Sequence, residues 1–215
     1  IKLIEEVGIP IDYVAGTSMG SIIGGMYALG YTSAEMDSII SNMDWSFYMS
    51  NKVDRREVSY EHKSMDSRYL IDIPFDIPKK INDRLIKGMT EENLEDVTVI
   101  GQKSFVNSLP GGYINGNNIF NMLNSLAVGY QDSINFNNLP IPYACVSVNA
   151  MDGSQKIHRD GSLPTAMRAS MAIPGVFTPV HVGNEVLVDG GMLNNFPVDV
   201  CKAMGADIII GVNLS

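Results

Sequence analysis

The sequence predicts an α/β fold in which helices cover both faces of a mostly parallel sheet. Short apolar runs typical of buried strands alternate along the 215 residues with segments of helical periodicity. Hydrophobic residues make up 45% of the chain and charged residues 18%, which indicates a folded globular protein and not a disordered one. Neither a repeat nor a low-complexity tract nor a linker interrupts the pattern, so a single domain over residues 1–215 is predicted.

The first half of the chain alternates between helical and extended patterns. The predicted elements are a helix tail at 1–8, a buried strand at 9–15, a turn at 16–20, a helix at 21–29 and a second helix from Thr32 towards Met43. Residues 44–78 are polar, aromatic and charged, without sustained periodicity. They are predicted to form an irregular excursion, which either covers a site or is an ordinary surface connection.

The second half continues the same alternation after residue 116. The predicted elements are a helix at 117–128, a buried strand at 141–148, a hairpin arm at 155–158, a helix at 163–171, a strand at 185–188, a helix at 197–204 and a last buried strand at 208–212. The hairpin is expected to turn around Asp152-Gly153.

Charge and cysteine content narrow the function classes. The net charge of −9 argues against nucleic acid as a partner, and contact with an anionic membrane would need a local patch. Cys145 and Cys201 belong to no CxxC or Cys/His cluster, so we expect two small core residues and neither a metal site nor a disulfide. No run of eighteen apolar residues occurs, so no membrane-spanning helix is expected.

A turn between a predicted strand and a predicted helix fits the G-x-S-x-G pattern of serine hydrolases. Its residues are Gly16-Thr17-Ser18-Met19-Gly20. Such a turn lifts a serine hydroxyl off the carboxyl end of a sheet, and the helix behind it offers N–H groups to an oxyanion, with that of Met19 the expected donor. A phosphate-binding loop would want a lysine near the helix start, and none occurs between Lys2 and Lys52. Ser18 is therefore predicted to be a nucleophile.

A serine hydroxyl needs a neighbouring base, and Asp189 is the leading candidate. It ends an apolar strand and is followed by Gly190 and Gly191, which let the backbone turn and leave the carboxylate uncrowded. Two strand ends in one parallel sheet can bring a carboxylate to a hydroxyl. The α/β-hydrolase order of Ser, acid and then His is not met, because His62, His158 and His181 all precede Asp189. A triad that uses another acid with one of these histidines stays open as the alternative.

These motifs resemble those of the patatin-like phospholipase family. The shared stretches are Ile9-Pro10-Ile11-Asp12 before the Ser18 turn, Ala169-Ser170-Met171-Ala172-Ile173-Pro174-Gly175-Val176-Phe177, and Asp189-Gly190-Gly191 followed by Asn194-Asn195-Phe196-Pro197-Val198-Asp199. The resemblance implies a three-layer α/β/α fold and a lipid acyl hydrolase or phospholipase A that requires no metal or cofactor. It also implies a Ser18–Asp189 dyad without histidine, an acyl-enzyme intermediate and a lipid or phospholipid ester as substrate.

The family also carries a glycine-rich oxyanion loop shortly before the nucleophile turn. The chain begins after the position of such a loop, and the helix tail at 1–8 matches the segment that should follow it, so we expect an N-terminally truncated catalytic domain. If the protein lacked the loop, a non-catalytic lipid-binding domain would be the alternative, since losing one oxyanion donor costs ~10²–10³ in rate. The apolar stretch 173–180 either lines an acyl channel or packs in the core.

Overall fold

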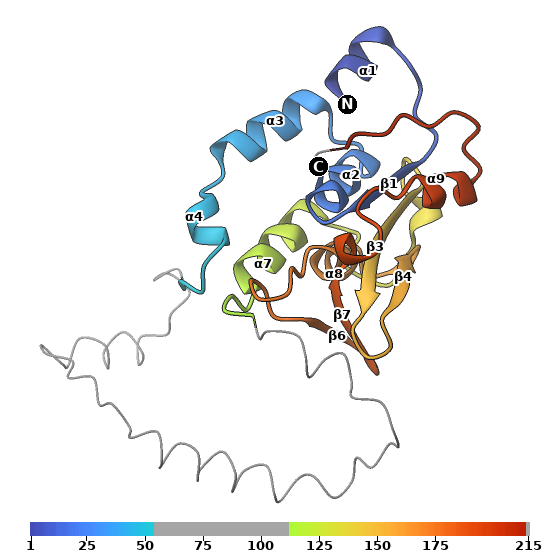
Figure 1. Ribbon diagram of the computed structural model, residues 1–215. Coiled ribbons are helices and arrows are strands. Elements are labelled where there is room, and N and C mark those ends of the chain that lie inside the picture. The colour runs from blue at the N-terminus through green and yellow to red at the C-terminus, as the bar shows by residue number, and fades with distance from the viewer. Residues whose placement is uncertain (54–111, 214–215) are drawn as a thin grey trace, which may run out of the picture. The chain divides into compact units, whose positions relative to one another are not determined.

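The structure is a computed structural model that describes residues 1–53 and 112–213 (Figure 1). One compact unit comprises residues 1–52 and 104–215, and a second comprises residues 53–103. Of the excursion predicted at 44–78, the part from residue 54 onwards, which includes His62, lies outside the described residues. Within its described beginning, a short helix forms at Trp45–Tyr48. The prediction of a single domain stays a prediction.

The described chain contains helices and strands at most of the positions that the sequence predicts. The helices are α1 (Lys2–Val7), α2 (Met19–Ala28), α3 (Ser33–Asn42), α4 (Trp45–Tyr48), α7 (Asn117–Leu126), α8 (Leu163–Ser170) and α9 (Val198–Met204), with 3-10 turns η2 (Phe136–Asn138) and η3 (Gly190–Met192). The strands are β1 (Val14–Thr17), β2 (Ile134–Asn135), β3 (Tyr143–Asn149), β4 (Ser154–His158), β5 (Asp160–Gly161), β6 (Val180–Val182) and β7 (Glu185–Asp189).

Local side-chain chemistry explains where α3 begins. Thr32 and Glu35 form a capping box, in which the Thr32 hydroxyl accepts from the Glu35 N–H and the Glu35 carboxylate accepts from the Thr32 N–H. The start predicted for this helix is confirmed to within one residue. The Glu5 carboxylate of α1 also accepts hydrogen bonds from the N–H and hydroxyl of Ser33, which ties α1 to the start of α3.

The central sheet is mixed, and the prediction of a mostly parallel sheet is wrong for the strands that the structure describes. β1 pairs with β3 in parallel, whereas β4 and β7 both run antiparallel to β3, and β6 runs antiparallel to β7. The β4 pairing follows from the tight turn at Asp152-Gly153, which the sequence predicts, because hairpin arms are antiparallel. The apolar run of β7 gave no indication of its direction, since periodicity does not distinguish the two pairings.

β1 and β7 lie end to end along one edge of β3, with their carboxyl ends facing each other. β4 pairs with residues 145–149 of β3 and so occupies one edge of it. Because a strand has two edges, β1, on residues 143–146, and β7, on residues 147–149, must share the other edge. They run in opposite directions, so their carboxyl ends approach each other where Thr17 lies opposite Val146 and Asp189 opposite Ser147.

Alternate side chains of β3 bind the layers on its two faces together. Tyr143 and Cys145 are fully buried in a large apolar cluster with residues of α2, α7 and α8. Ala144 and Val146 point to the other face and pack against Val200 of α9. The predicted α/β fold with helices on both faces of the sheet is therefore confirmed, and the elements can be followed in Figure 1.

Two predicted strands differ in the structure. The strand predicted at 9–15 begins only at Val14, whose N–H donates to the Pro142 carbonyl. Pro140 and Pro142 lack N–H groups, so the facing segment cannot extend this ladder backwards. The last strand predicted at 208–212 is wrong: no described strand pairs with this segment, and Ile208 is 86% exposed.

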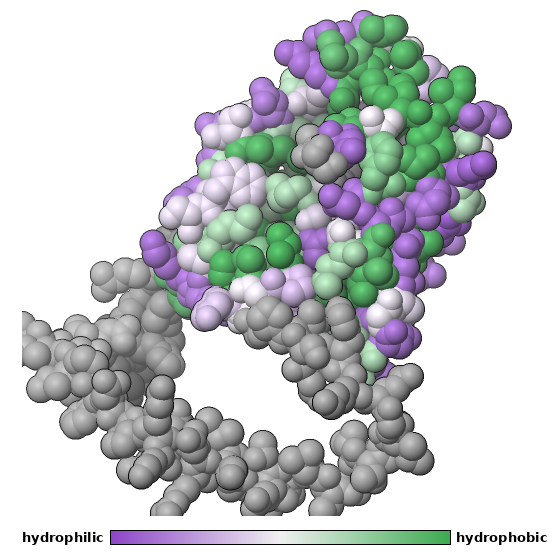
Figure 2. Space-filling model, in the orientation of Figure 1, coloured by the Kyte–Doolittle hydropathy of each residue, from purple (hydrophilic) through white to green (hydrophobic). Residues whose placement is uncertain are grey.

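In Figure 2, hydrophobic side chains gather on the upper part of the surface, where Figure 1 places α1 and the segment after α9.

Candidate active site

Ser18 occupies a strained turn between β1 and α2. Its φ of 56° and ψ of −125° make it the one non-glycine residue with positive φ in the described part of the chain. Glycine at position 16 is required by close approach, since a Cβ there would lie 2.8 Å from the backbone nitrogen of Ser21. An L-residue held in such a conformation costs free energy and is characteristic of functional sites.

The Ser18 hydroxyl donates to Oδ2 of Asp189 at 2.5 Å, across 171 residues of sequence. The second carboxylate oxygen of Asp189, Oδ1, accepts from the N–H of Gly191 at 2.7 Å. Asp189 is only 5% exposed. Burial raises the pKa of its carboxyl above the ordinary value, and the hydrogen bonds from Ser18 and Gly191 oppose that shift without cancelling it.

The two loop tips can meet because Gly190 lies directly against β3. A Cβ at Gly190 would lie 2.6 Å from the carbonyl carbon of Val146 and 3.1 Å from Cγ2 of Thr17. The turn after Asp189 thus crosses the backbone of β3, beside the end of β1, at a distance that only glycine allows. The Thr17 hydroxyl donates to the carbonyl of Asn194 at 2.9 Å and ties the same turn to β1.

The remaining motif residues frame the start of α2. Met19 and Gly20 form its first turn, where N–H groups have no intrahelical acceptor. The N–H of Met19 therefore remains the expected oxyanion donor. The side chain of Met19 is 39% exposed. Apart from its chain neighbours and the backbone of its own helix, no atom lies within 4 Å of a Cβ built on Gly20, so open space lies beside this turn.

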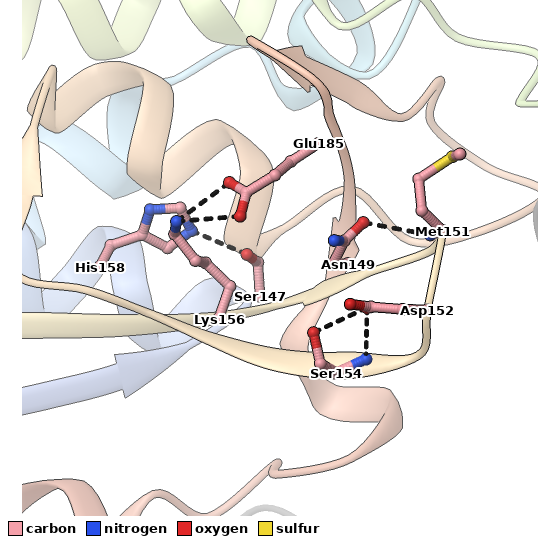
Figure 3. Close-up of polar contacts among 8 residues, drawn as sticks. All are labelled: Ser147, Asn149, Met151, Asp152, Ser154, Lys156, His158 and Glu185. Carbon is pink, nitrogen blue, oxygen red and sulfur yellow. Dashed lines mark hydrogen bonds and ion pairs between the residues drawn. The ribbon is translucent and has the colours of Figure 1, made fainter.

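Neither described histidine bonds to Ser18 or Asp189. Nε2 of His158 pairs with the Ser147 hydroxyl at 2.7 Å, inside the β3–β4 hairpin (Figure 3). Burial, together with the nearby Lys156 ammonium, lowers the pKa of His158 to about 4, so the ring is neutral at pH 7. His181 lies exposed on β6. Lys156 Nζ lies 3.0 Å from Oε2 of Glu185 on β7. This ion pair, drawn in the same close-up, links the hairpin to the strand that carries Asp189.

Two contacts near the pair were not predicted from the sequence. The hydroxyl of Ser170, the last residue of α8, accepts from the Ser18 N–H at 3.0 Å. The carbonyl of Ala172 accepts from the Asp189 N–H at 2.9 Å. Both residues belong to the stretch 169–177 that carries the family resemblance, and that resemblance was the only sequence signal pointing to them.

The part of the chain that the structure describes shows no metal site, disulfide or membrane-spanning helix. No group of three or more His, Cys, Asp or Glu side chains in residues 1–53 and 112–213 could hold a metal ion. Cys145 and Cys201 are free, as predicted. None of the described helices is both long and apolar enough to cross a membrane.

Comparison with known proteins agrees with the architecture. The family model described as patatin-like phospholipase matches residues 1–202. This chain belongs to the patatin-like phospholipase family. The match runs through every element that builds the Ser18–Asp189 pair, from α1 to α9, and ends within α9.

Relatives within the patatin-like phospholipase family are much longer proteins. Lysophospholipase NTE1 of Mycosarcoma maydis is 27% identical over 214 residues, which is 100% of this chain and 9% of that protein. Patatin-like phospholipase domain-containing protein 6 of Homo sapiens is 28% identical over 216 residues, which is 100% of this chain and 12% of that protein. An uncharacterised NTE family protein of Mycobacterium tuberculosis is 43% identical over 89 residues, 41% of this chain and 15% of that protein. The chain therefore spans only a small part of the length of these relatives.

Proposed function

We propose that this chain is the catalytic part of a lipid acyl hydrolase, a phospholipase A-type carboxylic ester hydrolase that works through a Ser18–Asp189 dyad. The observation that carries the proposal is the 2.5 Å hydrogen bond from the Ser18 hydroxyl to a buried carboxylate. Family membership supports the reaction class. The names of two relatives, a lysophospholipase and a phospholipase domain-containing protein, support a lipid ester as substrate.

The proposed reaction has two half-reactions that share one proton acceptor. Ser18 Oγ attacks the ester carbonyl carbon while Oδ2 of Asp189 takes its proton, and the Met19 N–H donates to the oxyanion. As the ester C–O bond breaks, Asp189 returns the proton to the leaving alcohol and the acyl group stays on Ser18. A water molecule then attacks the acyl-enzyme, gives its proton to Asp189, and Ser18 leaves with that proton as the free fatty acid departs.

Burial suits Asp189 to this role. A carboxylate with an ordinary pKa is a weak base for a serine hydroxyl, and burial raises the pKa of Asp189 and so its proton affinity. The short contact to Ser18 lets the proton pass directly, so the dyad needs no histidine. The alternative triad would need a histidine in contact with one of the pair, and His158 is instead neutral and bonded to Ser147.

The surface around the pair is suited to a lipid substrate. Apolar side chains within four residues of Ser18 or Asp189 in sequence are exposed, namely Met19 at 39%, Met192 at 45% and Leu193 at 57%. Such side chains can contact acyl chains or the edge of a lipid aggregate. Ile173 and Val176 of the stretch 173–180 are also exposed, whereas Phe177 lies in the core cluster. We propose peripheral contact with lipid at this surface, despite the overall charge of −9.

The test is covalent labelling with a fluorophosphonate probe, combined with burst kinetics on a chromogenic acyl ester. The wild-type protein should label once and show a burst of alcohol release. Ser18→Ala should abolish both signals, whereas Ser125→Ala, at an exposed helix position, should leave them unchanged. Asp189→Asn should lower kcat by ~10²–10⁴-fold, the usual range for loss of a general base, with Asp152→Asn in the exposed hairpin turn as its control. Retained labelling of Ser18→Ala would refute the proposal.

The triad alternative is tested by glutamine substitutions of His62, His158 and His181, one at a time. The dyad predicts that all three variants keep the burst. Loss of the burst in one of them, with the fold intact, would favour a triad.

A further inference from the structure

The serine that ends α8 occupies a gap in the hydrogen-bond ladder of the sheet. Parallel strands bond at every second residue, and the N–H of Val14 donates to the carbonyl of Pro142. Two further steps of two residues would bring the N–H of Ser18 to the carbonyl of Val146. Instead, the Ser18 N–H donates to Ser170 Oγ at 3.0 Å, and the Ser170 hydroxyl donates to the Val146 carbonyl at 2.6 Å. A side-chain hydroxyl thus stands between the two backbone groups where β1 leaves the sheet.

The same segment also holds the other member of the pair. Two residues after Ser170, the carbonyl of Ala172 accepts the Asp189 N–H at 2.9 Å. The turn from α8 into the following loop therefore contacts the backbone of both Ser18 and Asp189. Ser170 and Ala172 are both fully buried, so the acceptor atoms of these two bonds are shielded from solvent.

We infer that Ser170 is a positioning residue: its hydroxyl spaces the Ser18 backbone away from β3 and thereby sets the distance from Ser18 Oγ to Asp189. This inference rests on the proposed function of Ser18. Without the hydroxyl, the Ser18 N–H either remains buried without an acceptor or moves towards the Val146 carbonyl, which would draw the nucleophile into the sheet. A displacement of about 1 Å at a reacting group can cost ~10²-fold in rate.

The test is Ser170→Ala, with activity expressed per active site. Active-site titration with the fluorophosphonate probe counts competent molecules, so a variant that only folds less well would keep the wild-type kcat per titrated site. We expect Ser170→Ala to lower kcat per site and the probe's labelling rate by ~10–10²-fold, with KM changed less than about twofold because the hydroxyl does not face substrate. Thr165→Val removes a hydroxyl on the same helix that donates to Ser162, the residue just before its first turn, and should leave kcat per site unchanged.

Two further variants keep the inference testable if alanine prevents folding. Ser170→Thr retains a hydroxyl and should restore most of the activity, whereas Ser170→Cys keeps a similar volume with a weak hydrogen-bonding group and should not. Wild-type kcat per site in Ser170→Ala or in Ser170→Cys would overturn the inference while leaving the dyad untouched. Labelling that persists in Ser18→Ala would instead overturn the proposed function.

Discussion

Backbone strain at Ser18 can be measured by comparing two inactive variants, Ser18→Ala and Ser18→Gly. Both remove the hydroxyl and its hydrogen bond to Asp189, so they differ only in the Cβ. At φ 56° and ψ −125°, a residue with a Cβ is strained by ~1–3 kcal/mol, whereas glycine is not. Glycine also makes the unfolded chain more flexible, which costs ~0.5–1 kcal/mol of stability.

The difference of these two terms predicts that Ser18→Gly is about 1 kcal/mol more stable than Ser18→Ala. For a chain of this size, that corresponds to a Tm about 2–4 °C higher. Urea denaturation and thermal unfolding, each followed by circular dichroism, would measure both quantities. The control is Ala203→Gly, at an exposed position of α9, where glycine should destabilise by ~1 kcal/mol. If Ser18→Gly were no more stable than Ser18→Ala, the turn would not be strained and the geometry argued for the nucleophile would be wrong.

Four further predictions concern the base, the turn and the core. Because burial raises the pKa of Asp189, the acid limb of the kcat/KM profile should lie above the range of an ordinary aspartate, and activity should appear as pH rises through that pKa. Because the pKa of Asp189 is higher in the folded state than in the unfolded state, burying the charged carboxylate lowers the free energy of unfolding once pH has risen above that pKa. Asp189→Asn removes this charge, so the variant should unfold at a higher urea concentration than wild type at pH 7 but not at pH 3. Gly16→Ala should destabilise by ~1–3 kcal/mol and reduce probe labelling, because its Cβ would meet backbone atoms of Gly20 and Ser21 that cannot move aside. Tyr143→Phe should cost ~1–2 kcal/mol in urea unfolding without changing kcat per titrated site, since it leaves the buried carbonyl of Ser21 without its 2.6 Å donor.

Local patterns predicted most of the helices and several strands of this fold. Apolar periodicity together with start and stop residues predicted the boundaries of α2, α3, α7 and α8 to within about two residues. The strand patterns were less informative, because an apolar run does not tell its direction or whether a partner exists. The run at 208–212 looked like a strand and is exposed, since a strand needs a neighbouring ladder that the run itself cannot specify.

The structure brings Ser18 and Asp189 together, but with other strand directions than the prediction assumed. The prediction assumed that both residues end parallel strands at the same edge of the sheet. In the structure, β1 and β7 run in opposite directions and meet tip to tip beside β3. Gly190 was predicted only to let the backbone turn and to leave the carboxylate uncrowded. The structure adds that Gly190 lies too near the backbone of β3 for a Cβ, as Gly16 does near the backbone at the start of α2. The role of Ser170 could not be predicted, since a buried serine at a helix end has no distinguishing local pattern.

The end-to-end arrangement of β1 and β7 explains why the site needs hydrogen-bonding partners from the end of α8 and the residues after it. Where two strands end against the same edge of a third, the ladder is interrupted, and the backbone groups at the break require other partners. The Ser18 N–H and the Val146 carbonyl find the Ser170 hydroxyl, and the Asp189 N–H finds the Ala172 carbonyl. These bonds allow the turn at Ser18 to leave the sheet and yet remain fixed, so that a strained serine and a buried carboxylate keep a 2.5 Å contact. A continuous ladder would bond the same groups but would hold Ser18 in the plane of the sheet, where its hydroxyl could not reach a substrate.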